Sequence, residues 1–157
     1  MAVLVFGHKN PDTDTIVSAI AVADLKNKLG VEAKAVAQGA CNPESTFVLD
    51  KFGLEAPEVV TSVKGQQVIL VDHSDLAQSP DDLMEAEIVG VVDHHKLGDI
   101  TTPNPLEMWV WPVGCSGTVI KGMYDFFNVE VPKGIAGALM CAILSDTVMF
   151  KSVTCTD

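Results

Sequence analysis

Three short apolar runs constrain the fold of this chain more than any other feature of its sequence. They are Val3–Phe6, Val68–Val71 and Ile88–Val92, and each is apolar at every or nearly every position. A strand with one face in water alternates apolar and polar residues, whereas a continuous apolar run is typical of a strand that is covered on both faces. The runs therefore predict a parallel sheet that lies between layers of helices.

The segments between these runs carry helix signals. Apolar residues recur at helical spacing over residues 16–23, with Gly30 as a stop signal, and Asn42–Pro43 is typical of an N-cap followed by proline in the first turn, with Gly53 closing that helix. The sequence further predicts a short helix after Pro80, a strand over Met108–Trp111, and helices near Ser116–Phe127 and Lys133–Ile143. This alternation predicts an α/β fold, an open, doubly wound and mostly parallel sheet with helices on both faces.

Composition excludes several classes of function. The chain has 157 residues and a net charge of -11, and its ten basic residues are all Lys, which argues against an extended nucleic-acid footprint. The N-terminal apolar run is too short for a signal peptide, and the longest apolar stretch, Ile135–Leu144, is shorter than the ~20 residues that a bilayer requires. The four cysteines form no CxxC pair, which favours reduced thiols in a cytoplasmic protein. The charge and the short apolar stretches together predict no nucleic-acid and no membrane partner.

Titratable side chains follow each of the three apolar runs. In chain order they are His8, Asp12 and Asp14, then Asp72, then Asp93, His94 and His95. The carboxyl ends of parallel strands share one edge of a sheet, where ligands bind, and Asp146 after the last predicted helix is placed to join them. The sequence therefore predicts that one crevice gathers histidine and aspartate side chains from distant parts of the chain.

Some of these residues also fit structural roles. Asp12 and Asp14 suit the N-cap of a helix, and Asp72 suits a turn at the end of a strand. His73 would point away from Asp72 if the strand continues, so we expect it to have a supporting, hydrogen-bonded role. The run Asp93–His95 is harder to explain structurally, because a buried strand rarely ends in three titratable groups without a ligand.

The donor set favours two divalent cations. The candidate ligands are His8, Asp12, Asp14, Asp72, His94 and Asp146. Six N and O donors without a thiolate are too many for a tetrahedral zinc site and suit a pair of ions such as Mn²⁺, Co²⁺ or Mg²⁺. Asp72, on the central strand, is the candidate to bridge both ions. Paired ions lie ~3.5–4 Å apart and share a hydroxide that attacks a phosphoryl centre, so the set predicts metal-assisted hydrolysis of a phosphorus ester or anhydride.

Several segments carry a family resemblance. They are Gly7–Thr15, Val71–Ser74, Val92–His95, Pro112–Thr118, Ser145–Thr147 and Phe150–Asp157, the last with Val153 where proline is usual. In these segments the chain resembles the manganese-dependent, family II inorganic pyrophosphatases of the superfamily named for its Asp-His-His motif. The resemblance covers essentially the whole chain and implies the N-terminal domain of such an enzyme.

The resemblance implies a role for each residue of the site. His8, Asp12 and Asp72 would hold one Mn²⁺, and Asp14, Asp72, His94 and Asp146 would hold the other. His95 would contact the substrate phosphate or help to activate the bridging water, and Asp93 would orient a neighbouring ligand. The reaction would be the hydrolysis of pyrophosphate, accompanied by Mg²⁺, to two phosphates in a cytoplasmic homodimer that pairs through this domain, for which an edge strand at Met108–Trp111 is suited.

The resemblance also sets an expectation about domains. Family enzymes carry a C-terminal domain whose Arg and Lys side chains grip the substrate, so residues 1–157 are expected to be a truncated catalytic domain without that clamp. We expect such a chain to bind metal and to hydrolyse pyrophosphate poorly when alone. Three alternatives stay open: a polyphosphatase, a phosphodiesterase or exonuclease of the same superfamily, and a non-catalytic metal-binding dimerisation module.

Overall fold

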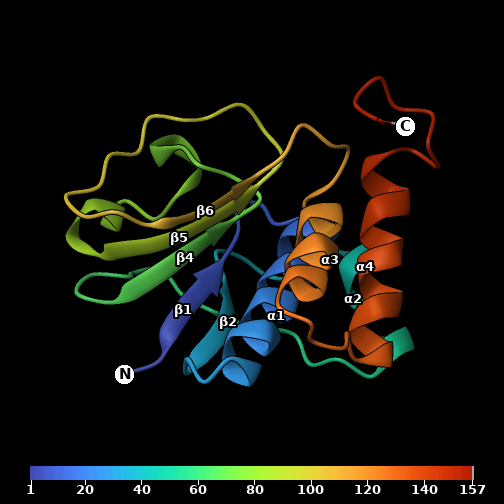
Figure 1. Cartoon of the computed structure of the whole chain (residues 1–157), viewed down its shortest axis with the longest axis horizontal. Coiled ribbons are helices and arrows are strands. Elements are labelled where there is room, and N and C mark those ends of the chain that lie inside the picture. The colour runs from blue at the N-terminus through green and yellow to red at the C-terminus, as the bar shows by residue number, and fades with distance from the viewer. Residues whose placement is uncertain (157) are drawn as a thin grey trace.

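The sheet is entirely parallel. A computed structural model of the chain describes residues 1–156, and within them six strands pair in the order β3-β2-β1-β4-β5-β6 (Figure 1). The strands are β1 (Val3–Phe6), β2 (Ala33–Ala37), β3 (Glu58–Val59), β4 (Gln67–Val71), β5 (Glu87–Asp93) and β6 (Glu107–Val110). The α/β class predicted from the sequence is confirmed, and the three continuous apolar runs are β1, β4 and β5, the neighbours at the centre of the sheet.

The two faces of the sheet are covered unequally. The helices are α1 (Thr13–Lys28), α2 (Pro43–Phe52), α3 (Ser116–Phe126) and α4 (Lys133–Asp146), with 3₁₀ helices η1 (Leu76–Gln78) and η2 (Leu83–Glu85). The four α-helices pack on one another on one side of the sheet (Figure 1). The opposite face is covered by the β4–β5 connection, which contains both 3₁₀ helices, so the short helix predicted after Pro80 is a single 3₁₀ turn.

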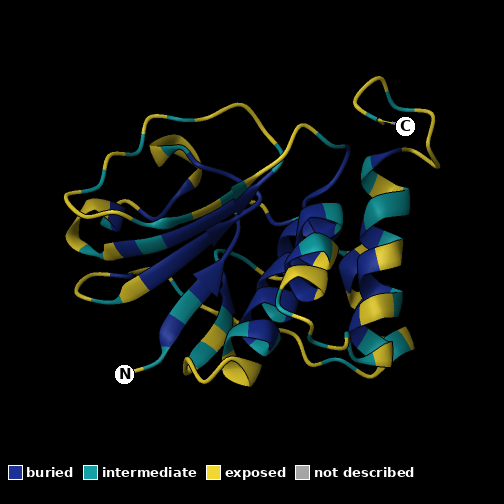
Figure 2. Cartoon of the chain, viewed as in Figure 1, coloured by how far each residue is buried: buried dark blue, intermediate teal, exposed yellow. Residues whose placement is uncertain are grey.

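Alternate residues of each central strand enter different cores. Val5 and Val71 pack with α1 in one apolar cluster, whereas Phe6 and Leu70 pack with Leu83 of η2 in another. The central strands are accordingly buried over most of their length, with Gln67 and Glu87 exposed where β4 and β5 begin (Figure 2). Burial on both faces is the physical reason that these strands are continuously apolar in sequence.

The helix ends follow the predicted signals. Asn42 caps α2 by accepting a hydrogen bond from the Ser45 amide at 2.7 Å, and Gly53 ends that helix at φ 66°, in the left-handed region that glycine enters without steric cost. α4 continues beyond its predicted end near Ile143 and includes Asp146 as its last residue. Asp146 therefore lies at a helix C-terminus and not in a following loop.

Two strands were not identified from the sequence. β2 contains the exposed Lys34 between partly buried alanines, and β3 is only two exposed residues long, so neither shows a continuous apolar run. Among the described residues, no helix has both the length and the apolar character that crossing a bilayer would require. The four cysteines are free thiols, as predicted.

Candidate metal centre

Asp72 lies at the centre of the carboxyl edge of the sheet. It directly follows β4 and has φ 60°, a left-handed conformation that few residues other than glycine adopt. Its side chain is 2% exposed, and its two oxygens accept hydrogen bonds from Thr15 Oγ1 at 2.7 Å and Ser116 Oγ at 3.0 Å. These contacts fix the carboxylate so that Oδ2 faces His8 and Oδ1 faces His94.

One group of candidate ligands forms around Oδ2 of Asp72. His8 Nε2 lies 3.4 Å from Asp12 Oδ2 and 3.4 Å from Asp72 Oδ2, and the ligand atoms of the three residues lie within 4.8 Å of one another. His8 Nδ1 donates to the Lys9 carbonyl at 2.7 Å, which directs Nε2 toward the two carboxylates. Asp12 also caps α1 through its other oxygen, so its structural and ligand roles are compatible.

A second group forms around Oδ1 of Asp72. His94 Nε2 lies 3.3 Å from Asp72 Oδ1. It also lies 3.7 Å from Asp146 Oδ2 and 3.9 Å from Asp14 Oδ2. The ligand atoms of the four residues lie within 4.8 Å of one another. Asp72 is thus common to both groups, one oxygen toward each.

His94 carries a buried atom that lacks a partner. Its Nδ1 donates to the Val113 carbonyl at 2.9 Å, whereas Nε2 is buried and finds no hydrogen-bond partner within residues 1–156. Buried polar atoms are nearly always satisfied, so an orphaned imidazole nitrogen aimed at three carboxylates calls for an explanation. A cation between His94 and those carboxylates supplies one, and on this ground the residues present fit a metal.

The carboxylates repel one another. Burial, together with the charges of Asp72 and Asp146, raises the pKa of Asp14. Burial and the charges of Asp72 and Asp12 raise the pKa of Asp146 to about 6. Divalent cations relieve this repulsion, because positive charge beside a carboxylate stabilises its ionised form.

The same carboxylates favour the protonated form of the nearby histidine His8. Burial lowers the pKa of His8, but hydrogen bonds with Asp12 and Asp72 outweigh burial and raise it to about 11. Burial raises the pKa of Asp72, yet the close imidazole nitrogens of His8 and His94 and the hydrogen bond from Thr15 outweigh it and hold that pKa below its usual range. Asp72 is therefore the carboxylate that stays ionised at the centre of the cluster.

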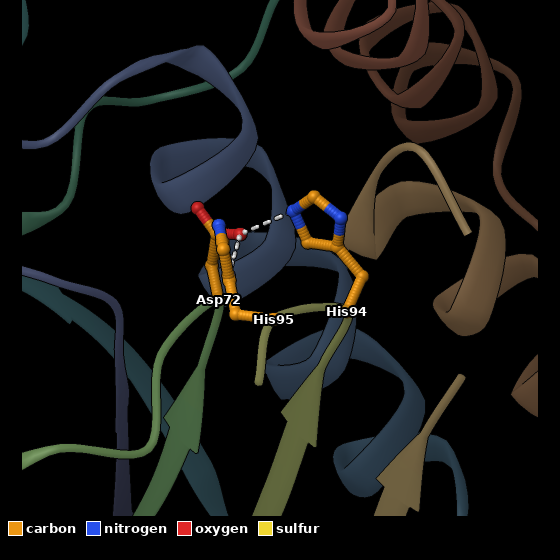
Figure 3. Close-up of side chains that lie close together, drawn as sticks. All are labelled: Asp72, His94 and His95. Atoms are coloured by element: carbon orange, nitrogen blue, oxygen red, sulfur yellow. Dashed lines mark ion pairs between the residues drawn. The ribbon is translucent and has the colours of Figure 1, made fainter. Parts of the chain in front are cut away.

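The ring of His95 lies beside that of its neighbour His94, with the ring centroids 4.1 Å apart. Figure 3 shows both rings beside Asp72, with His95 Nδ1 3.8 Å from Asp72 Oδ1. Asp93 Oδ1 accepts from His95 Nδ1 at 2.8 Å and from the amides of His94 and His95 at 2.8 and 3.1 Å. This hydrogen bond raises the pKa of His95, whose side chain is 51% exposed and presents Nε2 as its free nitrogen. Asp93 thus orients His95 and does not face the ligand groups.

Two cavities flank this cluster. One of about 270 Å³ lies toward the loop after β4, and one of about 510 Å³ lies toward residues 152–154, with Asp72, His95 and Lys96 lining both. Sequence reasoning did not identify Lys96, nor the hydroxyl donors Thr15 and Ser116 that hold Asp72. The supporting role predicted for His73 is confirmed, because its nitrogens bond the Val71 carbonyl and Ser79 Oγ at 2.9 and 3.0 Å.

The fold and the site define a parallel α/β protein with a candidate centre for two divalent cations. The chain belongs to the DHH family: the family model of the N-terminal domain matches residues 2–143.

Comparison with known proteins agrees with this assignment. A protein of Archaeoglobus fulgidus named "Probable manganese-dependent inorganic pyrophosphatase" is 53% identical, over 99% of this chain and 52% of the relative. The manganese-dependent inorganic pyrophosphatase of Bacillus subtilis is 48% identical, over 99% of this chain and 51% of its own. A crystal structure from Methanococcus jannaschii, described as a candidate family II inorganic pyrophosphatase, is 44% identical with a TM-score of 0.91, covering 100% of this chain and 52% of that one. The resemblance inferred from the sequence motifs is confirmed.

A more distant structure shares the fold alone. An exopolyphosphatase-related protein from Bacteroides fragilis superposes with a TM-score of 0.76 at 12% identity, over 95% of this chain and 47% of its own. The chain spans about half the length of the curated relatives it matches.

Proposed function

We propose that this chain is the metal-binding domain of a manganese-dependent inorganic pyrophosphatase, which hydrolyses pyrophosphate to two phosphates. The observation that carries the proposal is the pair of ligand groups that meet at Asp72. This arrangement occurs in a chain about half identical to proteins named for manganese and pyrophosphate. Two cations sharing a carboxylate are the usual apparatus for attack of water on a phosphoryl group.

Two Mn²⁺ ions are the proposed cofactors, with Co²⁺ or Mg²⁺ as substitutes. His8, Asp12 and Asp72 would hold one, and Asp14, Asp72, His94 and Asp146 would hold the other. When bound, such ions make water nucleophilic near neutral pH and withdraw charge from phosphoryl oxygens. The orphaned Nε2 of His94 supports this assignment, because an imidazole nitrogen whose partner nitrogen bonds a carbonyl is the usual donor to a metal.

The remaining residues would bind the substrate and handle protons. Asp72 would hold the two ligand groups in a fixed position relative to each other, because its carboxylate accepts hydrogen bonds from Thr15 and Ser116. His95, oriented by Asp93, presents Nε2 beside both cavities, where it would contact a phosphate oxygen or exchange a proton with it. Mg²⁺ would accompany the substrate, as the family resemblance implies.

Substrate binding is proposed to need more than residues 1–157. The chain contains no Arg, and its curated relatives are about twice as long, so the basic side chains that grip pyrophosphate would come from a second domain. In phosphoryl transfer, much of the rate enhancement comes from such side chains, which position the substrate and stabilise its charge. We therefore expect this chain alone to bind Mn²⁺ and to turn over pyrophosphate slowly.

The test is a comparison of substrates with the Mn²⁺-loaded protein. Phosphate release is measured from pyrophosphate, a long polyphosphate and a dinucleotide, for the wild type, Asp72→Asn and the control Asp50→Asn, whose carboxylate is exposed on α2. Slow release from pyrophosphate alone, abolished in Asp72→Asn and kept in Asp50→Asn, supports the proposal. Preference for polyphosphate or the dinucleotide favours the other phosphoesterases, and bound Mn²⁺ without any turnover favours a non-catalytic module.

A homodimer is proposed through the free edge of β6. Met108 and Val110 are 46% and 38% exposed on this edge strand, while Trp109 packs beside Phe126 and Phe127. An exposed apolar edge invites pairing with a second strand, and two copies of one edge pair about a two-fold axis. Sedimentation should show a dimer that Val110→Lys dissociates; a wild-type monomer contradicts this proposal.

The cellular compartment is proposed from the family resemblance and from the cysteines. Four free thiols favour a reducing compartment, and we propose the cytoplasm. The net charge of -11 disfavours nucleic acid as a partner, which a binding assay at low salt would check.

A further inference from the structure

Glu44 joins the ends of three helices without belonging to either ligand group. It lies in the first turn of α2, and its Oε1 accepts hydrogen bonds from Thr13 Oγ1 at the start of α1 and from Ser145 Oγ at the end of α4, the latter at 2.9 Å. Thr13 is 1% exposed and also contacts Ser45 Oγ at 3.3 Å. One carboxylate oxygen therefore connects α1, α2 and α4 at the rim of the site.

Both partners of Glu44 directly precede candidate ligands. Thr13 is followed by Asp14 and Ser145 by Asp146, and these two carboxylates face His94 Nε2 from different helices. A shift of either helix end would open the second group, in which the distances to His94 are 3.7 and 3.9 Å. The first group depends on Glu44 through α1 alone, because Asp12 also adjoins Thr13 and caps that helix by accepting from the Thr15 amide at 2.9 Å, whereas His8 follows β1. The second group depends on Glu44 through both α1 and α4.

Asp146 has the greater need of an external support. It is the last residue of α4, where the helix dipole disfavours a negative charge, and Asp14 and Asp72 lie close to it. Asp14, by contrast, is held by the amides of Ser116 and Gly117 at 2.8 and 3.1 Å. The hydrogen bond from Ser145 to Glu44 is thus well placed to hold the C-terminal end of α4 beside the second ligand group.

We propose that Glu44 is a positioning residue for the second cation group, Asp14, Asp72, His94 and Asp146. It acts through Thr13 and Ser145 and touches neither substrate nor cation. The proposal rests on the proposed function, because it presumes that this group binds a divalent ion. Outer residues that orient metal ligands typically change metal affinity 10–100-fold when they are removed.

The experiment measures how many Mn²⁺ ions bind and how tightly, by calorimetric titration of the metal-free protein. The variants are Glu44→Ala, Glu44→Gln, Ser145→Ala and the control Asp50→Ala, which removes a carboxylate from the same helix far from these contacts. We expect Glu44→Ala to leave the affinity for one Mn²⁺ ion unchanged and to lower the affinity for the other about 10–100-fold. Glu44→Gln keeps an oxygen acceptor for both hydroxyls and should stay within about threefold of the wild type.

Each outcome decides between the two proposals. If the wild type binds fewer than two ions, the proposed function fails, and the inference falls with it. If the wild type binds two ions and Glu44→Ala binds both with unchanged affinity, the inference is overturned and the proposed function stands.

The inference would also be overturned if Glu44→Ala lowered the affinity for both ions equally, or if Glu44→Gln lowered it as much as Glu44→Ala. Either result would show a general effect of the charge. Ser145→Ala removes an exposed hydroxyl and carries the same test if Glu44→Ala does not fold, since it should weaken the same ion.

Discussion

The metal-free protein should become more stable when Asp146 is replaced by Asn. Burial and the neighbouring charges of Asp72 and Asp12 raise the pKa of Asp146 from its ordinary value of 3.8 to about 6. Each pH unit of difference corresponds to about 1.4 kcal/mol, so ionised Asp146 destabilises the folded state by about 3 kcal/mol before screening. The side chain is 21% exposed and borders a cavity, which reduces the expected gain to about 1–2 kcal/mol.

The sign of the pH dependence follows from the direction of this pKa. A carboxyl group whose pKa is higher in the folded state favours folding while it is protonated, and that contribution is lost as pH rises from about 4 to about 6. Asn at position 146 cannot ionise. Asp146→Asn should therefore match the wild type near pH 4 and exceed it in stability above pH 7.

Urea unfolding in the presence of a chelator, at pH 4 and pH 7.5, measures the difference. Saturating Mn²⁺ should reverse the order at pH 7.5, because the variant loses one ligand and gains less from a bound ion. Asp50→Asn serves as the control. A metal-free Asp146→Asn protein that is less stable than the wild type at pH 7.5 would refute the reasoning.

Three further changes test other parts of the structure. Leu70→Ala, at a fully buried position, should lower the free energy of unfolding in urea by about 2–5 kcal/mol. A loss under about 1 kcal/mol would contradict the packing of Leu70 with Phe6 and Leu83. Asp93→Asn should lower the pKa of His95, followed by NMR titration of its imidazole, because the hydrogen bond that His95 donates to the Asp93 carboxylate raises that pKa; an unchanged titration would argue against this orientation of His95. Millimolar Mn²⁺ should raise the melting temperature of the metal-free wild type and leave Asp72→Asn nearly unaffected, whereas equal shifts in both would place the ions elsewhere.

The central part of the fold was predictable because burial on both faces leaves a direct trace in the sequence. β1, β4 and β5 are continuously apolar for that reason, and parallel strands necessarily bring the residues that follow them to one edge. β2 and β3 leave no such trace, because they are short and partly exposed.

The candidate ligands were predictable as a set, but the contacts that hold them were not. His8, Asp72 and His94 stand next to strand ends in sequence, whereas Thr15 and Ser116 reach Asp72 only through the packing of α1 and α3. A hydroxyl at the start of a helix has no pattern that distinguishes a support for a carboxylate from an ordinary cap. α4 also extends to Asp146, beyond the helix end that the sequence predicted.

The shared carboxylate of Asp72 has a consequence for how the site fills. Its two oxygens serve different groups but belong to one rigid unit, so an ion that fixes the tilt of this unit on one side also sets the donor available on the other. If two ions bind as proposed, occupancy of the two positions would be thermodynamically linked, and each ion would change the affinity of the protein for the other by the same factor. A sequential titration with one metal would follow a curve that independent, non-interacting positions cannot reproduce.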